Sequence, residues 1–278
     1  ASKDVYIKVN AIDVRRHCYT DLNVIKETIR YFNAHGANRV YVVENCTQAN
    51  FTRLVMKVTG IEALCRQEGA TLVCLDETGA VPVYLEGLQT FIDISEFIHE
   101  RLIKNRDANL YVSIPKLKTH CMTQVTLSIK NQYGLVHHFS RIQDHNFRLH
   151  RKLADLYKVI RPDFSLIDGV IATNHGHSNA ENNLHRAVVP MDLLIAGRDP
   201  LATDVVGARL MGFEIQDVEH LNLCVPFTMG TGNWDEIEII NESLFQERKK
   251  TLTCELFDDF PPELTVLKGR ERCCREGC

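Results

Sequence analysis

The chain has 278 residues, of which 45% are hydrophobic and 24% are charged, and its formal net charge is −4. This balance is ordinary for one large globular domain and argues against a general nucleic-acid or membrane-surface binder. No apolar run approaches the roughly 20 residues that span a bilayer, and the strand-like VYIKVN near the first residue argues against a signal peptide. We therefore expect a cytoplasmic protein.

Strand and helix patterns alternate along the sequence. Strands are predicted at residues 5–9, 39–44, 71–75, 81–85, 109–115, 163–170, 192–197 and 236–240, and helices at 22–35, 48–68, 94–104, 147–160 and 200–211. The first helix has Ile25, Ile29 and Phe32 on one face, and the last one has Asp199 as its cap with a proline in its first turn. This order predicts an α/β fold, a mainly parallel sheet with helices on both faces.

Polar residues directly follow several predicted strands. In open parallel sheets, ligands bind at the carboxyl ends of the strands. The residues in such positions are Glu44 and Asn45, Lys116 to His120, Asp168 and Gly169, and Arg198 and Asp199. If the sheet is parallel, all of them meet at one edge. The sequence therefore predicts a polar site at the carboxyl ends of the strands.

The segment IPKLKTH gives the strongest signal for this site. In an extended chain, side chains two residues apart point the same way, so Lys116, Lys118 and His120 would project from one face. Lys130 and Asn131 follow about ten residues later, close to a glycine. Aligned cationic and proton-carrying groups at the end of a strand predict a site for an anionic ligand or for proton transfer.

Histidines concentrate in the same part of the sequence. Eight of the twelve lie between residues 120 and 185, and His175 and His177 flank a glycine in an asparagine-rich loop. Such a loop can bind a phosphate or a metal, because imidazole ligates zinc, nickel and iron, and Asp168 or Asp204 can add an oxygen ligand. A loop of this composition is also often a simple turn, so both interpretations stay open.

Ten cysteines are a high number for an intracellular enzyme. Seven are scattered along the sequence, and we predict that they are small buried hydrophobic residues with reduced thiols. The other three, Cys273, Cys274 and Cys278, lie within the last six residues. They can hold part of an iron–sulfur cluster or a zinc ion, with the remaining ligands supplied elsewhere. The alternative is the flexible end of a longer protein.

The sequence suggests two parts of unequal size. Residues 1–245 carry the α/β pattern, and residues 246–278 form a C-terminal extension with the cysteine cluster, which a truncation would also explain. The glycines of MGTGNW indicate a turn, and neither a phosphate-binding loop nor a complete dinucleotide fingerprint is present. The chemistry therefore has to come from the lysine, histidine and cysteine clusters.

Several segments together resemble a known family, the domain-of-unknown-function 362 family, whose members are often described as uncharacterised iron–sulfur-centre proteins. The matching segments are IPKLKTH, VTLSIKNQYGLV, LHRKLADL, RPDFSLIDGV and DLLIAGRDPLATDVVGARLMGF. The resemblance implies an α/β fold, in some members joined to cluster-binding cysteine domains. It marks as family-typical polar positions Lys116, Lys118, His120, Lys130, Asn131, His145, Asp168, Asp199 and Asp204. Where the family usually has a short Gly-Asn-Gly-Pro-like loop, this chain has residues 173–183.

The leading hypothesis is a metal- or iron–sulfur-associated enzyme, an oxidoreductase or an isomerase, that acts on a small anionic metabolite. Its assigned residues are Lys116 and Lys118 for the anion, His120 or His145 for the proton, Lys130 and Asn131 for charge stabilisation, and Asp168 to orient a histidine. Glu44, Asn45, Asp199 and Asp204 are assigned to cofactor binding. The alternatives are an iron–sulfur electron-transfer or accessory subunit and an anion- or cofactor-binding protein. A ferredoxin-like protein or a second copy of the chain is the expected macromolecular partner; nucleic acid and membrane are not expected.

Overall fold

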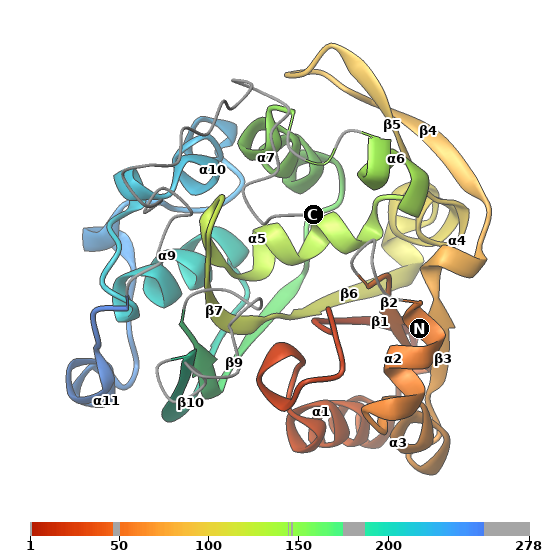
Figure 1. Cartoon of the computed structure of the whole chain (residues 1–278), viewed down its shortest axis with the longest axis horizontal. Helices are drawn as coiled ribbons and strands as arrows, with labels where there is room; N and C mark the ends of the chain where they lie inside the picture. The colour runs from red at the N-terminus through yellow and green to blue at the C-terminus, as the bar shows by residue number, and fades with distance from the viewer. Residues whose placement is uncertain (1, 47–50, 144, 146, 175–186, 253–278) are drawn as a thin grey trace, which may run out of the picture.

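A single large sheet organises the chain (Figure 1). The structure, a computed structural model, describes residues 2–46, 51–143, 145, 147–174 and 187–252. The strand order is β3-β2-β1-β6-β9-β7-β8, and β10 pairs with the other side of β9. The strands are β1 (Asp4–Val9), β2 (Arg39–Glu44), β3 (Thr71–Cys74), β6 (Asn109–Ile114), β7 (Lys116–His120), β8 (Gln124–Thr126), β9 (Phe164–Thr173) and β10 (Val188–Gly197). Most neighbouring pairs are parallel, as predicted.

Helices cover both faces of this sheet (Figure 1). One face carries α1 (Leu22–Ala34), α2 (Thr52–Val58) and α3 (Ile61–Gln67). The other carries α4 (Glu96–Ile98), α5 (Ser128–Asn131), α6 (His138–Gln143), α7 (Leu149–Val159), α9 (Pro200–Leu210), α10 (Glu219–Asn222) and, at the sheet edge, α11 (Glu242–Arg248). The predicted α/β fold with two helical layers is confirmed. No helix in the described ranges is long and apolar enough to cross a bilayer.

The side chains of β1 show how the two cores are divided. Val5, Ile7 and Val9 pack in the core beneath α1 to α3, whereas Tyr6 packs in the core beneath α5, α7 and α9. Because side chains alternate along a strand, Lys8 shares the face of Tyr6. A lysine is thus carried into the interior on the α5 side, where it is only 1% exposed.

Pro115 interrupts one long strand rather than ending it. It lies between β6 and β7, and both of these strands run parallel to the ten-residue β9. The Pro115 carbonyl accepts a hydrogen bond from the Asp168 backbone N–H at 2.8 Å. Beyond the proline, β7 turns back through β8 as an antiparallel pair. The lysine motif is therefore a strand whose five residues are all buried.

Two predicted helices have different bounds in the structure. The helix predicted at 48–68 is split into α2 and α3, because Gly60 adopts a φ of +84°, in the left-handed region that favours glycine; residues 47–50 lie outside the described ranges. The helix predicted from Ile94 begins only at Glu96. Ile94 belongs to β5 (Thr90–Ser95), which forms a separate hairpin with β4 (Ala80–Leu85). Its alternating apolar residues give the strand pattern that the helix prediction overlooked.

The last two predicted strands also differ. β10 is present, but it runs antiparallel to β9. Arg198 and Asp199, which follow it, therefore lie at the opposite edge from Glu44 and Asn45, and the prediction that all four meet at one edge is wrong. The predicted strand at 236–240 is wrong as well. Ile237 and Ile239 pack against the core, whereas Ile240 is 94% exposed. The alternating apolar residues therefore mark a segment without regular secondary structure that packs on one side only.

Candidate functional site

A polar pocket of about 70 Å³ lies at the carboxyl ends of β1, β2 and β7, on the α5 face of the sheet. Its lining residues are Lys8, Asn10, Ile12, Glu44, Asn45, Lys118, His120, Thr126, Lys130, Asn131, Tyr133, Gly134, Arg141 and His145. Seven of them are predicted site residues. A space of this size can admit the head group of a small carboxylate or phosphate.

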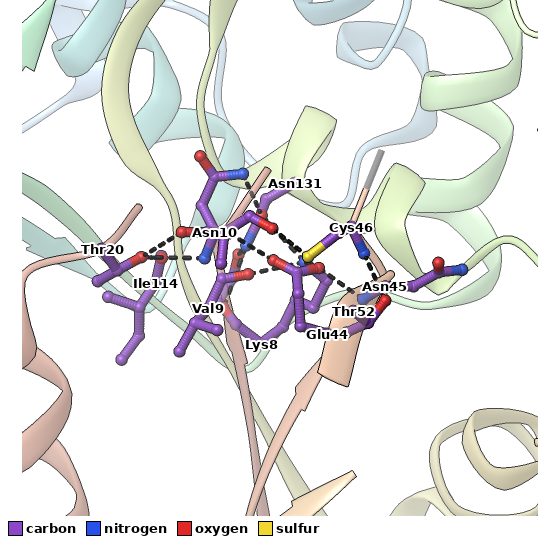
Figure 2. Close-up of polar contacts among 12 residues, drawn as sticks. Lys8, Val9, Asn10, Thr20, Glu44, Asn45, Cys46, Thr52, Ile114 and Asn131 are labelled. Atoms are coloured by element: carbon purple, nitrogen blue, oxygen red, sulfur yellow. Dashed lines mark hydrogen bonds and ion pairs between the residues drawn. The ribbon is translucent and has the colours of Figure 1, made fainter. Parts of the chain in front are cut away.

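A buried ion pair between Lys8 and Glu44 forms the floor of the pocket (Figure 2). Burial lowers the pKa of Lys8, and the Glu44 carboxylate opposes this shift. Glu44 also accepts the backbone N–H of Ala11 at 2.6 Å and that of Asn45 at 2.8 Å. A Cβ on Gly134 would lie 2.7 Å from Lys8 Cε and 2.9 Å from Glu44 Oε1. A side chain at position 134 would collide with the Lys8–Glu44 ion pair, and glycine leaves room for it.

Asn131 connects α5 to the central strands. Its amide nitrogen donates to the Lys8 carbonyl and to Ser113 Oγ, each at 3.1 Å. Its amide oxygen accepts from Lys8 Nζ and from Asn10 Nδ2, each at 3.3 Å (Figure 2). Both ends of the Asn131 amide are thus hydrogen-bonded. The side chain holds α5 against the central strands, and it has no unused donor or acceptor to offer a ligand.

Arg141, on α6, is a buried cation that the sequence did not single out. It is 6% exposed, and its Nη2 donates to Asn45 Oδ1 at 2.6 Å and to the Cys46 carbonyl. Burial lowers the pKa of Arg141. Its Nε has no hydrogen-bond partner among the described residues. The guanidinium is therefore fixed at one nitrogen and has an unsatisfied donor at another.

The pocket carries an excess of positive charge. Its lining includes four cationic side chains, those of Lys8, Lys118, Lys130 and Arg141, against the carboxylate of Glu44. Lys118 and His120 reach it from β7, where both are nearly buried at 2% and 4% exposure. In such surroundings an anion is attracted strongly, because little water screens the charges.

Lys116 and Asp168 form a second buried ion pair, apart from the pocket lining. Lys116 Nζ donates to Asp168 Oδ2 at 2.8 Å, and the two side chains are 1% and 0% exposed. Asp168 also accepts the backbone N–H groups of Asp21 at 2.7 Å and of Val170 at 3.0 Å. The partner of Asp168 is therefore Lys116, in place of the predicted histidine. Lys116 fixes β7 to β9, and Lys118 is the lysine of the motif that lines the pocket.

Asp199 and Asp204 act on helix ends rather than at the pocket. Asp199 caps α9 by accepting from the backbone N–H groups of Leu201 at 3.0 Å and Ala202 at 3.1 Å, as its sequence position predicts. Asp204 is fully buried and accepts the N–H groups of Ser128 and Ile129 at 2.8 and 2.7 Å. Burial raises the pKa of Asp204 to about 8, although the two N–H groups oppose this shift. Asp204 thereby holds the start of α5, the helix that carries Lys130 and Asn131.

Comparison with known proteins identifies the family of this chain. A family model described as Domain of unknown function (DUF362) matches residues 5–209, which include every residue that lines the pocket. The chain belongs to the DUF362 family. It is also similar to the thylakoid-associated protein sll1697 of Synechocystis sp., with 32% identity over 122 residues, or 41% of this chain and 36% of that protein. The match thus spans little more than a third of that relative.

The described residues of this DUF362 chain do not fit an iron–sulfur cluster or another metal centre. They contain no group of three or more His, Cys, Asp or Glu side chains arranged to hold a metal ion. Burial raises the pKa of Cys18 to about 11 and that of Cys65 and Cys74 to about 12, which disfavours the thiolate that ligates metals. The predicted metal ligands His175, His177, Cys273, Cys274 and Cys278 all lie outside the described ranges.

His220 is a buried histidine close to the pocket that the DUF362 resemblance does not mark. It is 0% exposed, and neither ring nitrogen has a hydrogen-bond partner in the described part of the chain. Its pKa lies well below the ordinary value, first because of burial and then because His150, Lys130 and His120 lie nearby. The folded chain therefore keeps this imidazole neutral.

Replacing His220 with leucine is expected to make folding less sensitive to acid. Below pH ~6.5 the unfolded chain binds a proton at this histidine and the folded chain does not, so stability falls as the pH decreases. H220L should remove about 1.4 kcal/mol of that loss per pH unit between pH ~6.5 and ~5. Urea unfolding at several pH values measures this, and equal slopes for the two proteins would contradict it.

Proposed function

We propose that the pocket binds the anionic head group of a small metabolite, a carboxylate or a phosphate. The observation that carries this proposal is the Arg141 guanidinium, buried and anchored at Nη2, with an unsatisfied Nε. A buried donor without a partner costs about 1–3 kcal/mol, and arginine is well suited to paired hydrogen bonds with carboxylates and phosphates. Lys118 and Lys130 add positive charge around the same space.

His120 is the residue that we assign to a hydrogen bond with the bound anion. The backbone N–H of Met122 donates to His120 Nδ1 at 3.1 Å, so the neutral ring carries its own proton on Nε2. In this tautomer Nε2–H can donate a hydrogen bond to a bound anion. Proton transfer to a substrate requires the imidazolium form, and it stays a prediction for His120 as for His145. His145 also lines the pocket, and its carbonyl accepts a hydrogen bond from the Tyr133 hydroxyl at 3.1 Å.

The redox part of the hypothesis stays a prediction. It depends on a metal or an iron–sulfur cluster held by Cys273, Cys274 and Cys278, which lie outside the described ranges. The same holds for a ferredoxin-like or second-copy partner and for a cytoplasmic location. The pocket chemistry that we propose needs none of these, because it uses only side chains that line the pocket.

Anion binding by the purified protein tests the proposal. We expect inorganic phosphate or acetate to bind, and R141Q to weaken the binding about 10- to 100-fold, the equivalent of one lost charge-assisted hydrogen bond. Isothermal titration calorimetry measures both. R209Q is the matched control, because Arg209 pairs with Glu214 away from the pocket and should bind like the unmodified chain. No binding of either anion, or equal binding by R141Q, would overturn the proposal.

A further inference from the structure

Asn10 lines the pocket and has a buried side-chain acceptor without a partner among the described residues. The residue follows β1, lines the pocket and is 5% exposed. Its Oδ1 has no hydrogen-bond partner in the ranges that the structure describes. Its backbone is fixed, since Asn10 N–H donates to Thr20 Oγ1 at 2.9 Å and its carbonyl accepts from Thr20 N–H at 2.8 Å. The amide is therefore held at the pocket wall and does not swing freely into solvent.

The orientation of the Asn10 amide follows from its neighbours. Lys8 Nζ can only donate, so the atom of Asn131 that it contacts must be the oxygen. The other end of Asn131 faces the Lys8 carbonyl, which can only accept, so it must be the nitrogen. Asn10 meets Asn131 at that oxygen and must offer its own NH₂ group (Figure 2). The unpartnered atom of Asn10 is consequently an acceptor, and flipping the amide would place two oxygens against each other.

An acceptor among cations selects a particular kind of ligand. A carboxylate or a doubly ionised phosphate ester complements the positive charge of Lys118, Lys130 and Arg141, but it has no donor for Asn10. A second donor on the ligand is needed, and an ammonium group is disfavoured by four nearby cations. A hydroxyl group is a neutral donor that meets this need. Thr126 Oγ1 also has no partner within the described part of the chain, but a hydroxyl both accepts and donates, so it does not distinguish between ligands in this way.

We propose that the natural ligand is a hydroxylated small anion, a hydroxy acid or a hydroxyalkyl phosphate, whose hydroxyl donates to Asn10 Oδ1. This inference rests on the proposed function, because it assumes that the anionic group occupies the cationic part of the pocket. Asn10 is then the residue that determines specificity: it distinguishes an anion that carries a hydroxyl from the same anion without one, since the latter leaves a buried acceptor unsatisfied.

Matched ligand pairs test this inference by calorimetry on the whole chain. The pairs are glycolate with acetate and 2-hydroxyethyl phosphate with ethyl phosphate, and glycine serves as the ammonium analogue. We expect the hydroxylated member to bind about 10- to 100-fold more tightly than its partner, and glycine to bind no better than acetate. N10L should bring the two affinities of a pair together, whereas T126V should lower both and keep their ratio.

The outcomes separate this inference from the function on which it rests. If both members of each pair bind equally well to the unmodified chain, the hydroxyl selection is wrong and the anion site stands. If T126V abolishes the preference and N10L keeps it, the assignment to Asn10 is wrong. If no anion of the panel binds, the proposed function fails and the inference fails with it. The carboxylate and phosphate pairs also show which head group the pocket prefers.

Discussion

Replacing Glu44 with glutamine is expected to lower the free energy of unfolding at pH ~7 by about 3–5 kcal/mol, the typical loss when a buried ion pair loses one partner. Lys8 would remain in the interior without a carboxylate, and only the Val9 carbonyl and Asn131 Oδ1 would accept from its ammonium group. The glutamine NH₂ group would also face a backbone N–H that Glu44 now accepts, from Ala11 or from Asn45. Chemical unfolding with urea measures the loss.

The pH dependence of this variant follows from the pKa of Lys8. Burial already lowers that pKa, and without Glu44 the opposing effect is gone. Between the lowered pKa of Lys8 and pH ~10.4 the unfolded chain then binds more protons than the folded chain, so the stability of E44Q should rise with pH in that range. The double variant K8M/E44Q also removes the ammonium group of Lys8, which has lost its carboxylate partner in E44Q. It should therefore be more stable than E44Q at pH ~7.

An exposed ion pair provides the control for this experiment. Glu100 and Lys104 lie one helical turn apart at the surface, with side chains 41% and 57% exposed. E100Q should leave the midpoint of urea unfolding unchanged, because water and salt screen such pairs. The interpretation of the Lys8–Glu44 pair would be refuted if E44Q unfolded at the same urea concentration as the unmodified chain, or if its stability did not change with pH.

Local sequence patterns were sufficient for most of the sheet. The strand at Arg39–Glu44 has the predicted bounds, because a run of β-branched and aromatic residues between polar ends has few alternatives. What local patterns cannot supply is strand direction. β10 has the same apolar character whether it runs parallel or antiparallel to β9, and only its pairing places Asp199 at the far edge. Direction is a property of the whole topology, so the prediction failed there.

The site was predicted in part for a similar reason. Lys118 and His120 were assigned to the site because charged groups directly after a buried strand are unusual, and Lys130 because it follows about ten residues later, close to a glycine. Lys8 was missed because VYIKV gives an alternating pattern, in which a polar residue is normally assigned to solvent. Its burial depends on Glu44, which lies in another strand. Arg141 belongs to a short helix with no pattern of its own, and only the fold brings it to Asn45.

Asp204 was assigned to cofactor binding, and in the structure its carboxylate accepts the first two N–H groups of α5. We expect D204A to lower the free energy of unfolding by about 2–6 kcal/mol, since the buried N–H groups of Ser128 and Ile129 would each lose an acceptor at about 1–3 kcal/mol. The start of α5 should loosen as well. Because α5 carries Lys130 and Asn131, anion binding should weaken even where the protein stays folded.

A carboxylate on the same helix gives the matched comparison. D199A removes the N-cap of α9, which typically costs about 0.5–2 kcal/mol, and Asp199 also accepts the N–H of Thr231 at 2.8 Å. It should therefore be destabilised less than D204A and keep the anion affinity of the unmodified chain. Hydrogen exchange at the amides of Ser128 and Ile129 should speed up in D204A alone. If D204A were destabilised and yet bound phosphate normally, with slow exchange at both amides, Asp204 would not position α5, and the order of the pocket wall would come from the bonds of Asn131 to the central strands.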